Sequence, residues 1–200
     1  MTASSVPFDA SRPHVARVYD YLLGGKDNFV ADRTVGDRML ASIPAVQLGV
    51  RAQRDVLGRV VRYLVREVGL RQLLDIGSGL PTADNVHEIA QRIDPATRVV
   101  YLDNDPIVLS HAEALPSGSY VFIHHLLATE DPAAAVLQEQ MRTGLGRAQF
   151  RTMDQVRDLF GGLDLVEPGL VLVPDWRPEP PTVRDHPVLE MACVGVARKR

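Results

Sequence analysis

The chain has 200 residues, 46% of them hydrophobic and 24% charged, which is ordinary for one globular domain with a proper core. The net charge of −3 argues against a nucleic-acid-binding protein, and no apolar run of about 18 residues predicts a membrane-spanning helix. The first ten residues lack the basic region and apolar core of a signal peptide. The single cysteine, Cys193, fits a reducing compartment and should be buried, so we expect a cytoplasmic protein without a membrane partner.

The N-terminal part of the chain predicts two short helices. Residues 1–12 are expected to form a disordered lead-in, and residues 13–45 a helical cap on a larger domain. Apolar residues at helical spacing predict a first helix that ends at the glycine pair 24–25. A polar turn then leads into a second helix, which Asp27 or Asn28 could cap.

The longest helical pattern covers residues 46–68 and opens the main domain, residues 46–200. Its apolar positions form one stripe, as expected for a helix that packs on a sheet. Five arginines lie mainly off this stripe: Arg51, Arg54, Arg59, Arg62 and Arg66. We expect them to form a solvated face, with an anion-binding site as the alternative.

The remaining chain alternates between strands and helices. Strands are predicted within residues 73–76, 98–102, 119–125, 163–173 and 189–197. Helices are predicted over residues 82–93, with Thr82 as the cap, and over residues 106–115, 131–143 and 153–160. The early alternation predicts an α/β fold with a mostly parallel sheet, and the last two strands predict an antiparallel hairpin at its edge.

The turn after the first strand carries the main functional signal. The sequence LLDIGSGLPTADN places Asp75 at the carboxyl end of the strand, followed by a tight turn of Gly77, Ser78 and Gly79 and then a helix. Glycines let the backbone approach a ligand closely, and open α/β sheets bind ligands at this end of their strands. We therefore expect Asp75 and the turn to line a ligand site.

A second acidic group follows the neighbouring strand, at Asp103 and Asn104. A carboxylate there can accept hydrogen bonds from both hydroxyls of a ribose, although Asp103 could also be a turn residue before the next helix. A dinucleotide fingerprint would have a third glycine where Thr82 stands, and Pro81 is bulky for a pyrophosphate. The pattern instead favours a phosphate-free cationic nucleoside such as S-adenosylmethionine (SAM), whose positive charge Asp75 could balance.

Three segments resemble the bacterial SAM-dependent methyltransferase family once catalogued as a domain of unknown function: residues 15–29, 73–88 and 99–109. Residues 160–170 and 176–178 are also similar to that family. The resemblance implies a class I Rossmann-like domain over residues 46–200, with SAM as cofactor and as methyl donor. It also implies that Asp75, Gly77 and Gly79 line the SAM turn and that Asp103 holds the ribose.

The resemblance assigns further residues to the site. Tyr19, Lys26, Asp27 and Asn28 belong to the N-terminal motif, which we expect over the mouth of the cofactor site. No general base is evident from the sequence. The candidates are the paired histidines at the end of the third strand, His124 and His125. No His/Cys cluster has the spacing of a metal site, so no metal is expected.

The spacing between the second and third strands predicts an internal shortening. A parallel β-α-β step needs about 30 residues, and the resembling family has further strands here, including a loop that holds the adenine. The junction is placed at residues 115–117. Three hypotheses follow: a SAM-dependent methyltransferase acting on a small molecule, a non-catalytic protein that retains the methyltransferase fold, and an NAD-dependent oxidoreductase. The oligomeric state cannot be predicted.

Overall fold

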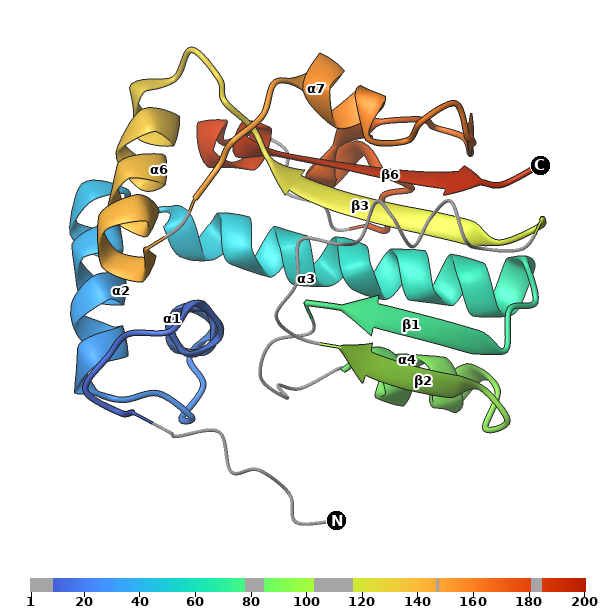
Figure 1. The fold of residues 1–200 in the computed structure, drawn as a ribbon, viewed down its shortest axis with the longest axis horizontal. Helices are drawn as coiled ribbons and strands as arrows, with labels where there is room; N and C mark the ends of the chain where they lie inside the picture. The colour runs from blue at the N-terminus through green and yellow to red at the C-terminus, as the bar shows by residue number, and fades with distance from the viewer. Residues whose placement is uncertain (1–8, 78–84, 103–116, 147, 181–184) are drawn as a thin grey trace.

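The computed structural model describes residues 9–77, 85–102, 117–146, 148–180 and 185–200. One long helix, α3 (Val46–Arg62), organises these parts, because a small parallel sheet and a larger antiparallel sheet both pack against it (Figure 1). None of the helices in the described ranges is long and apolar enough to cross a membrane. The predicted lead-in lies mostly outside the described residues.

The two N-terminal helices form as predicted, but the second has a different cap. The helix α1 (Val15–Leu23) ends at Gly24, which adopts φ +84°. The helix α2 (Val30–Ser42) is capped at Phe29, whose backbone N–H donates to the Asp32 carboxylate at 2.9 Å. The prediction that Asp27 or Asn28 caps this helix is therefore wrong, because the Asn28 amide is committed to other partners in the preceding turn.

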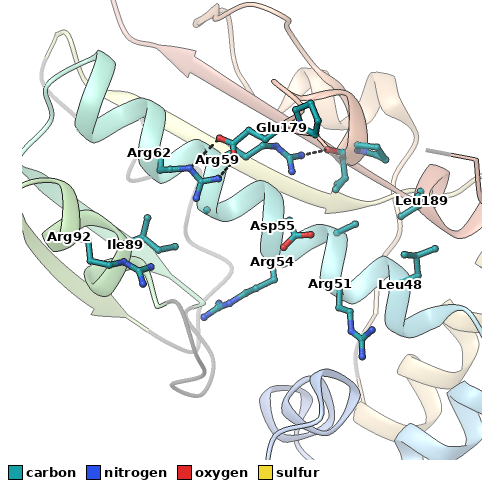
Figure 2. Close-up of a pocket in the computed structure, with 15 residues that line it drawn as sticks. Leu48, Arg51, Arg54, Asp55, Arg59, Arg62, Ile89, Arg92, Glu179 and Leu189 are labelled. Atoms are coloured by element: carbon teal, nitrogen blue, oxygen red, sulfur yellow. Dashed lines mark hydrogen bonds and ion pairs between the residues drawn. The ribbon is translucent and has the colours of Figure 1, made fainter. Parts of the chain in front are cut away.

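The helix α3 has the predicted extent and continues through a π-helical turn, Tyr63–Glu67. Its apolar stripe is buried, with Val56 and Val60 at most 1% exposed. The prediction of a solvated arginine face is wrong in part. Arg59 is only 8% exposed, and four of the five arginines line a pocket on this side of the helix: Arg51, Arg54, Arg59 and Arg62 (Figure 2).

The parallel sheet has two strands, β1 (Gln72–Ile76) and β2 (Arg98–Leu102), as the sequence predicts. The helix α4 (Val86–Ile93) connects them and packs with Leu73, Val99 and one side of α3 in a common apolar cluster. Asn85 is the N-cap of α4, so the prediction that Thr82 caps this helix is wrong. Thr82 itself and the helix predicted over residues 106–115 lie outside the described residues.

The larger sheet is antiparallel, and it contradicts the expectation of a mostly parallel sheet. Its strand order is β3-β6-β4, and β5 also pairs with β6. Its strands are β3 (Tyr120–Leu126), β4 (Asp164–Leu165), β5 (Val171–Leu172) and β6 (Ala192–Arg198). Among the described strands, β1 and β2 form the only parallel pair.

The antiparallel pairing of the last strands is confirmed, and β4 and β5 lie at one edge of this sheet, whereas β6 does not. The strand β6 occupies the interior of its sheet, between β3 and β4. Cys193 on this strand is fully buried, as expected, and burial raises the pKa of its thiol to about 11. The strand β3 pairs with β6 and not with β1, so the two sheets stay separate. Strand partners are long-range contacts, which the local alternation of strands and helices does not specify.

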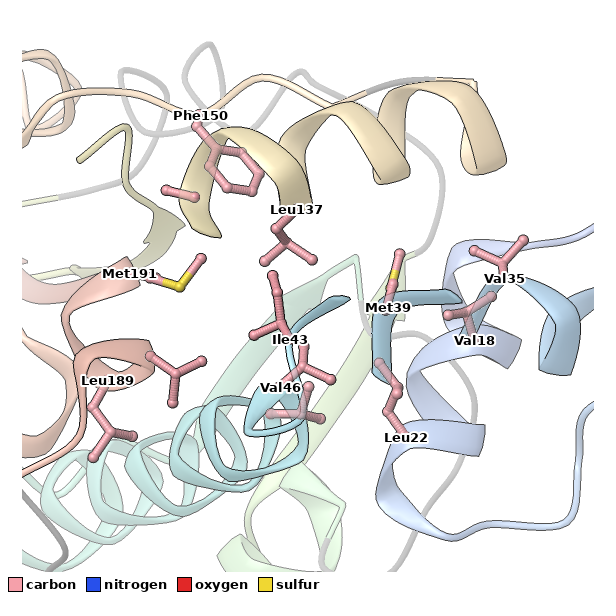
Figure 3. Packing of buried hydrophobic residues seen from close by; sticks show 13 residues of the cluster. Val18, Leu22, Val35, Met39, Ile43, Val46, Leu137, Phe150, Leu189 and Met191 are labelled. Atoms are coloured by element: carbon pink, nitrogen blue, oxygen red, sulfur yellow. The ribbon is translucent and has the colours of Figure 1, made fainter. Parts of the chain in front are cut away.

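The N-terminal helices share a hydrophobic core with the rest of the molecule (Figure 3). Val18 and Leu22 of α1 and Met39 of α2 belong to the same cluster as Leu137 of α6 (Pro132–Leu145) and Leu189 of the 3₁₀ turn Pro187–Met191. The helix α6 begins at the Asp131 cap, and α7 (Met153–Asp158) follows it, both close to their predicted positions. The predicted cap is thus packed firmly onto α3 and α6.

Candidate functional site

The strand β1 and the helix α4 form where the sequence predicts a strand and a helix, and the described part of the turn between them is Gly77. Asp75 is half-buried near the end of β1, in register with the second strand of the parallel pair. Gly77 follows with φ +77°, a backbone conformation that L side chains rarely adopt, so the chain turns sharply here. Ser78, Gly79, Asp103 and Asn104 lie outside the described residues, and their places in the site stay predictions.

The beginning of α4 is fixed by its own cap and by a contact from α3. The Asn85 backbone N–H donates to the Glu88 carboxylate at 2.8 Å, as in a capping box. The Arg54 guanidinium donates to the Asn85 side-chain oxygen at 3.3 Å. The hydrogen bond from Arg54 therefore connects α3 to the N-terminus of α4, the helix that follows Gly77 in the chain.

The N-terminal motif is a buried turn held by one carboxylate. Asp20 is 2% exposed, and its Oδ2 accepts hydrogen bonds from the Asp27 N–H and the Asn28 amide, both at 2.9 Å. The Asn28 amide also donates to the Gly25 carbonyl at 3.0 Å. A Cβ at Gly25 would stand 2.0 Å from Asp20 Oδ1, so only glycine fits. Asn28 therefore shapes the turn from within.

The other motif residues differ in exposure. Tyr19 is largely buried and donates its hydroxyl to the Val50 carbonyl at 3.4 Å, and burial raises the pKa of its phenol. The side chains of Lys26 and Asp27 are exposed. In Figure 1, β1 and β2 point towards the side of the molecule on which α1 lies. The arrangement is compatible with a motif beside the site, in which Lys26 and Asp27 are the side chains open to a ligand.

The two histidines lie on β3, in the antiparallel sheet, and the structure does not join them to the unit that carries Asp75. His125 has both ring nitrogens engaged, Nδ1 with the Leu126 carbonyl at 2.8 Å and Nε2 with the Arg151 guanidinium at 2.5 Å. Burial lowers its pKa, and Arg151 adds to the effect.

The Nε2 atom of His124 is buried and has no hydrogen-bond partner among the described residues. Burial, and then the neighbouring His125, lower the pKa of His124 to about 4. Its ring is consequently neutral at pH 7 and is a poor acceptor of protons from a substrate. Neither histidine thus has the open, basic nitrogen expected of a general base, and their catalytic role stays a prediction without structural support.

A pocket of about 430 Å³ lies along α3, next to the start of α4 (Figure 2). Its walls come from α3, from α4, from the segment 173–180 and from Leu189. Five of its lining residues are arginines and two are acids: Arg51, Arg54, Arg59, Arg62 and Arg92 with Asp55 and Glu179. The sequence does show that four of these arginines are spaced three to five residues apart on one helix, which is a sign of a shared site. It does not show that they are buried in a pocket.

The deepest arginine of this pocket is held by the backbone. Arg59 donates from Nε to the Trp176 carbonyl and from Nη2 to the Val173 carbonyl, both at 2.9 Å. Burial lowers the pKa of its guanidinium, although nearby acids oppose this effect. Arg62 forms an ion pair with Glu179 at 2.7 Å. No group of three potential metal ligands occurs in the described parts of the chain.

The fold is a methyltransferase-like α/β fold. It is defined by the parallel β1–α4–β2 unit, by Gly77 after β1, and by α3, which packs against this unit. The same fold is seen in a candidate methyltransferase from Thermobifida fusca YX, with a TM-score of 0.91, 32% identity and full coverage of both chains. A DUF574 family protein from Streptomyces avermitilis MA-4680 gives a TM-score of 0.88 and 30% identity, over 96% of this chain and 99% of that one.

The family model described as S-adenosyl methyltransferase matches residues 1–116 and 113–200, and the chain belongs to this family. The two matched stretches meet beside the junction predicted at residues 115–117. No curated protein matches the chain.

Proposed function

We propose that this protein is a SAM-dependent methyltransferase that transfers a methyl group to a small-molecule acceptor. The observation that carries the proposal is the β1–Gly77–α4 unit, in which Asp75 and a left-handed glycine stand at the carboxyl end of a parallel strand pair. The family description supports SAM as the donor. The low net charge favours a small acceptor over nucleic acid, and a cytoplasmic location belongs to the same proposal.

The residues at this end of β1 suit a phosphate-free, cationic nucleoside. Among the described residues, no heavy atom lies within 4 Å of where a Cβ of Gly77 would be, which leaves room on this side for a ligand. The Asp75 carboxylate supplies negative charge beside the turn. Bound SAM would supply the methyl group as an electrophile. Asp75 and Gly77, with the predicted Ser78, Gly79, Asp103 and Asn104, would hold its methionine and ribose ends.

Calorimetric titration with SAM, S-adenosylhomocysteine and NAD tests this function. We expect both SAM and S-adenosylhomocysteine to bind, and Asp103→Ala to weaken both by tenfold or more, because it removes hydrogen bonds to a charged acceptor. Asp158→Ala, at the exposed end of α7, is the matched control and should bind like the parent protein.

The other hypotheses predict different titrations. A protein that is folded by circular dichroism and binds none of the three ligands would contradict the proposal and favour a non-catalytic member of the fold. Binding of NAD alone would indicate an oxidoreductase. Binding of SAM that survives Asp103→Ala unchanged would contradict the assigned ribose site but not the cofactor.

A further inference from the structure

The pocket along α3 is strongly basic, in a protein whose net charge is −3. Among the described residues, its walls carry five guanidinium groups and two carboxylates. Arginine is the side chain best suited to bind carboxylate and phosphate groups, because its planar fork donates two parallel hydrogen bonds. The concentration of arginines therefore indicates a site for an anion.

The contacts of these arginines differ, and one arginine stands out as exposed. Arg59 donates to two backbone carbonyls, which are neutral acceptors, and is 8% exposed. Arg54 donates to the neutral side-chain oxygen of Asn85. Arg62 is paired with Glu179. Arg51 is exposed and makes no hydrogen bond or ion pair with any described residue. Arg51 is thus the guanidinium most available to an incoming acid.

The same pocket has apolar walls. Leu48 and Leu189 lie at the end that contains Arg51, and Ile89 of α4 lies towards the other end, near Arg92 (Figure 2). Val173 also lines the pocket. A volume of about 430 Å³ falls within the range of roughly 300–1,000 Å³ that is usual for small-molecule sites. The combination suits a small molecule with an acidic head and an apolar body.

The pocket also adjoins the unit proposed to hold the methyl donor. Arg54, in its wall, contacts Asn85 at the start of α4, and α4 itself contributes Ile89 and Arg92 to the lining. The Tyr19 hydroxyl contacts the carbonyl of Val50, one residue before Arg51 on α3. The helix α4 therefore borders this pocket, and the N-terminal motif contacts α3 next to it.

We infer that this pocket binds the methyl acceptor, and that the acceptor is a small carboxylate or phosphate with an apolar body. The inference rests on the proposed methyltransferase function and adds the chemical class of the acceptor. Arg51, the exposed arginine of the pocket, binds the acidic group, and the apolar side chains cover the remainder of the molecule. An acid held here lies on the side of α4 that faces α3.

Calorimetry on the full chain, saturated with S-adenosylhomocysteine, tests the inference with three probes of similar shape. Benzoate carries a carboxylate, phenyl phosphate carries a phosphate, and benzyl alcohol is the neutral control. We expect one or both acids to bind at least tenfold more tightly than benzyl alcohol, because the acids can accept a charge-assisted hydrogen bond from an arginine and the neutral alcohol cannot. The acid that binds better identifies the head group.

Matched variants assign the binding to the pocket. Arg51→Gln should weaken the binding of the acid about tenfold, whereas Arg66→Gln should not, since Arg66 is an exposed arginine of the π-helical turn outside the pocket. A thermal unfolding midpoint equal to that of the parent protein shows that each variant is folded. Equal losses in the two variants would overturn the inference.

Three further outcomes are decisive. If neither acid binds while S-adenosylhomocysteine does, the acceptor inference falls and the methyltransferase proposal stands. If the acids compete with S-adenosylhomocysteine, the pocket belongs to the donor and the acceptor inference falls. If S-adenosylhomocysteine itself does not bind, the methyltransferase proposal falls and the acceptor role falls with it, whatever the acids do.

Discussion

At the scale of single residues, the N-terminal motif shows how one buried carboxylate dictates its neighbours. The Asp20 carboxylate accepts hydrogen bonds from the Asp27 backbone and the Asn28 amide, and it lies directly against the Cα of Gly25. The sequence suggested that the motif lines the cofactor mouth. The structure adds that Asp20 and Asn28 satisfy each other, so their primary effect is on the shape of the turn.

This packing predicts the effect of a single methyl group. Gly25→Ala would place a Cβ 2.0 Å from Asp20 Oδ1, and we expect it to lower the free energy of unfolding by about 2 kcal/mol or more. Gly58→Ala in α3 is the matched control. Its Cβ would meet the far end of the Arg62 side chain at 3.3 Å and Ile89 Cδ1 at 3.7 Å, which needs little adjustment. Alanine also favours the helix, so stability should rise slightly. Urea unfolding measures both, and equal destabilisation would contradict the argument.

At the scale of elements, β3 carries a histidine on a face that is otherwise apolar. Tyr120, Phe122 and Leu126 of this strand pack against a cluster that includes Trp176. His124 lies between Phe122 and Leu126 in the same series of every second residue, and so on the same face of the strand. The uncharged ring fits there, because its Nε2 is buried without a partner. Protonation would place a charge in this apolar layer.

The burial of His124 therefore leads us to predict that stability depends on pH. Its pKa is about 4 when folded and near 6.5 when unfolded, so the unfolded state binds more protons between these values. The free energy of unfolding should fall as pH drops from 6.5 to 4, by on the order of 2–3 kcal/mol, and His125, whose pKa is also lowered, adds to this loss.

Urea titrations between pH 4 and pH 8 test this dependence. His124→Phe should remove most of the slope and leave stability at pH 7 nearly unchanged, since an apolar ring of similar shape replaces an unpaired polar one. His87→Phe on α4 is the control and should retain the slope of the parent protein. A slope that is unaffected by His124→Phe would show that other groups cause the acid sensitivity.

At the scale of the whole molecule, the two sheets are stabilised unequally. The strand β6 lies between β3 and β4, and Val194 and Val196 on it are fully buried. The strands β1 and β2 have no further partner among the described strands. On their outer face, Leu74 and Val100, which are paired in register, are 52% and 58% exposed. The parallel pair therefore rests on α3 and α4 by one face only.

This asymmetry predicts where the native protein opens first. Amide hydrogens of β1 and β2 should exchange at least tenfold faster than those of β6, because a local opening of the pair exposes less apolar surface than global unfolding does. Saturating S-adenosylhomocysteine should slow exchange in β1 and leave β6 unchanged, if the ligand binds at the end of β1. Hydrogen exchange followed by mass spectrometry measures this, and uniform protection would contradict it.

Features that depend on neighbours in sequence could be predicted well. The apolar periodicity of residues 46–68 gave α3, and Gly24 and Gly77 marked a helix end and a turn that the structure confirms. The caps of α2 and α4 were predicted incorrectly, because several polar residues near each start could have served. For Asn28 the choice was decided by Asp20, eight residues away.

The sequence by itself determined the elements, the glycine turn after β1 and the methyltransferase family, because spacing and motif are local properties of the chain. The tertiary structure decided that β3 joins β6 and not β1, and that Arg59 is buried while Arg51 stays exposed. Strand partners and burial result from the competition of distant segments for the same apolar surface, and no local pattern records its outcome. The arginine-lined pocket is a product of that competition.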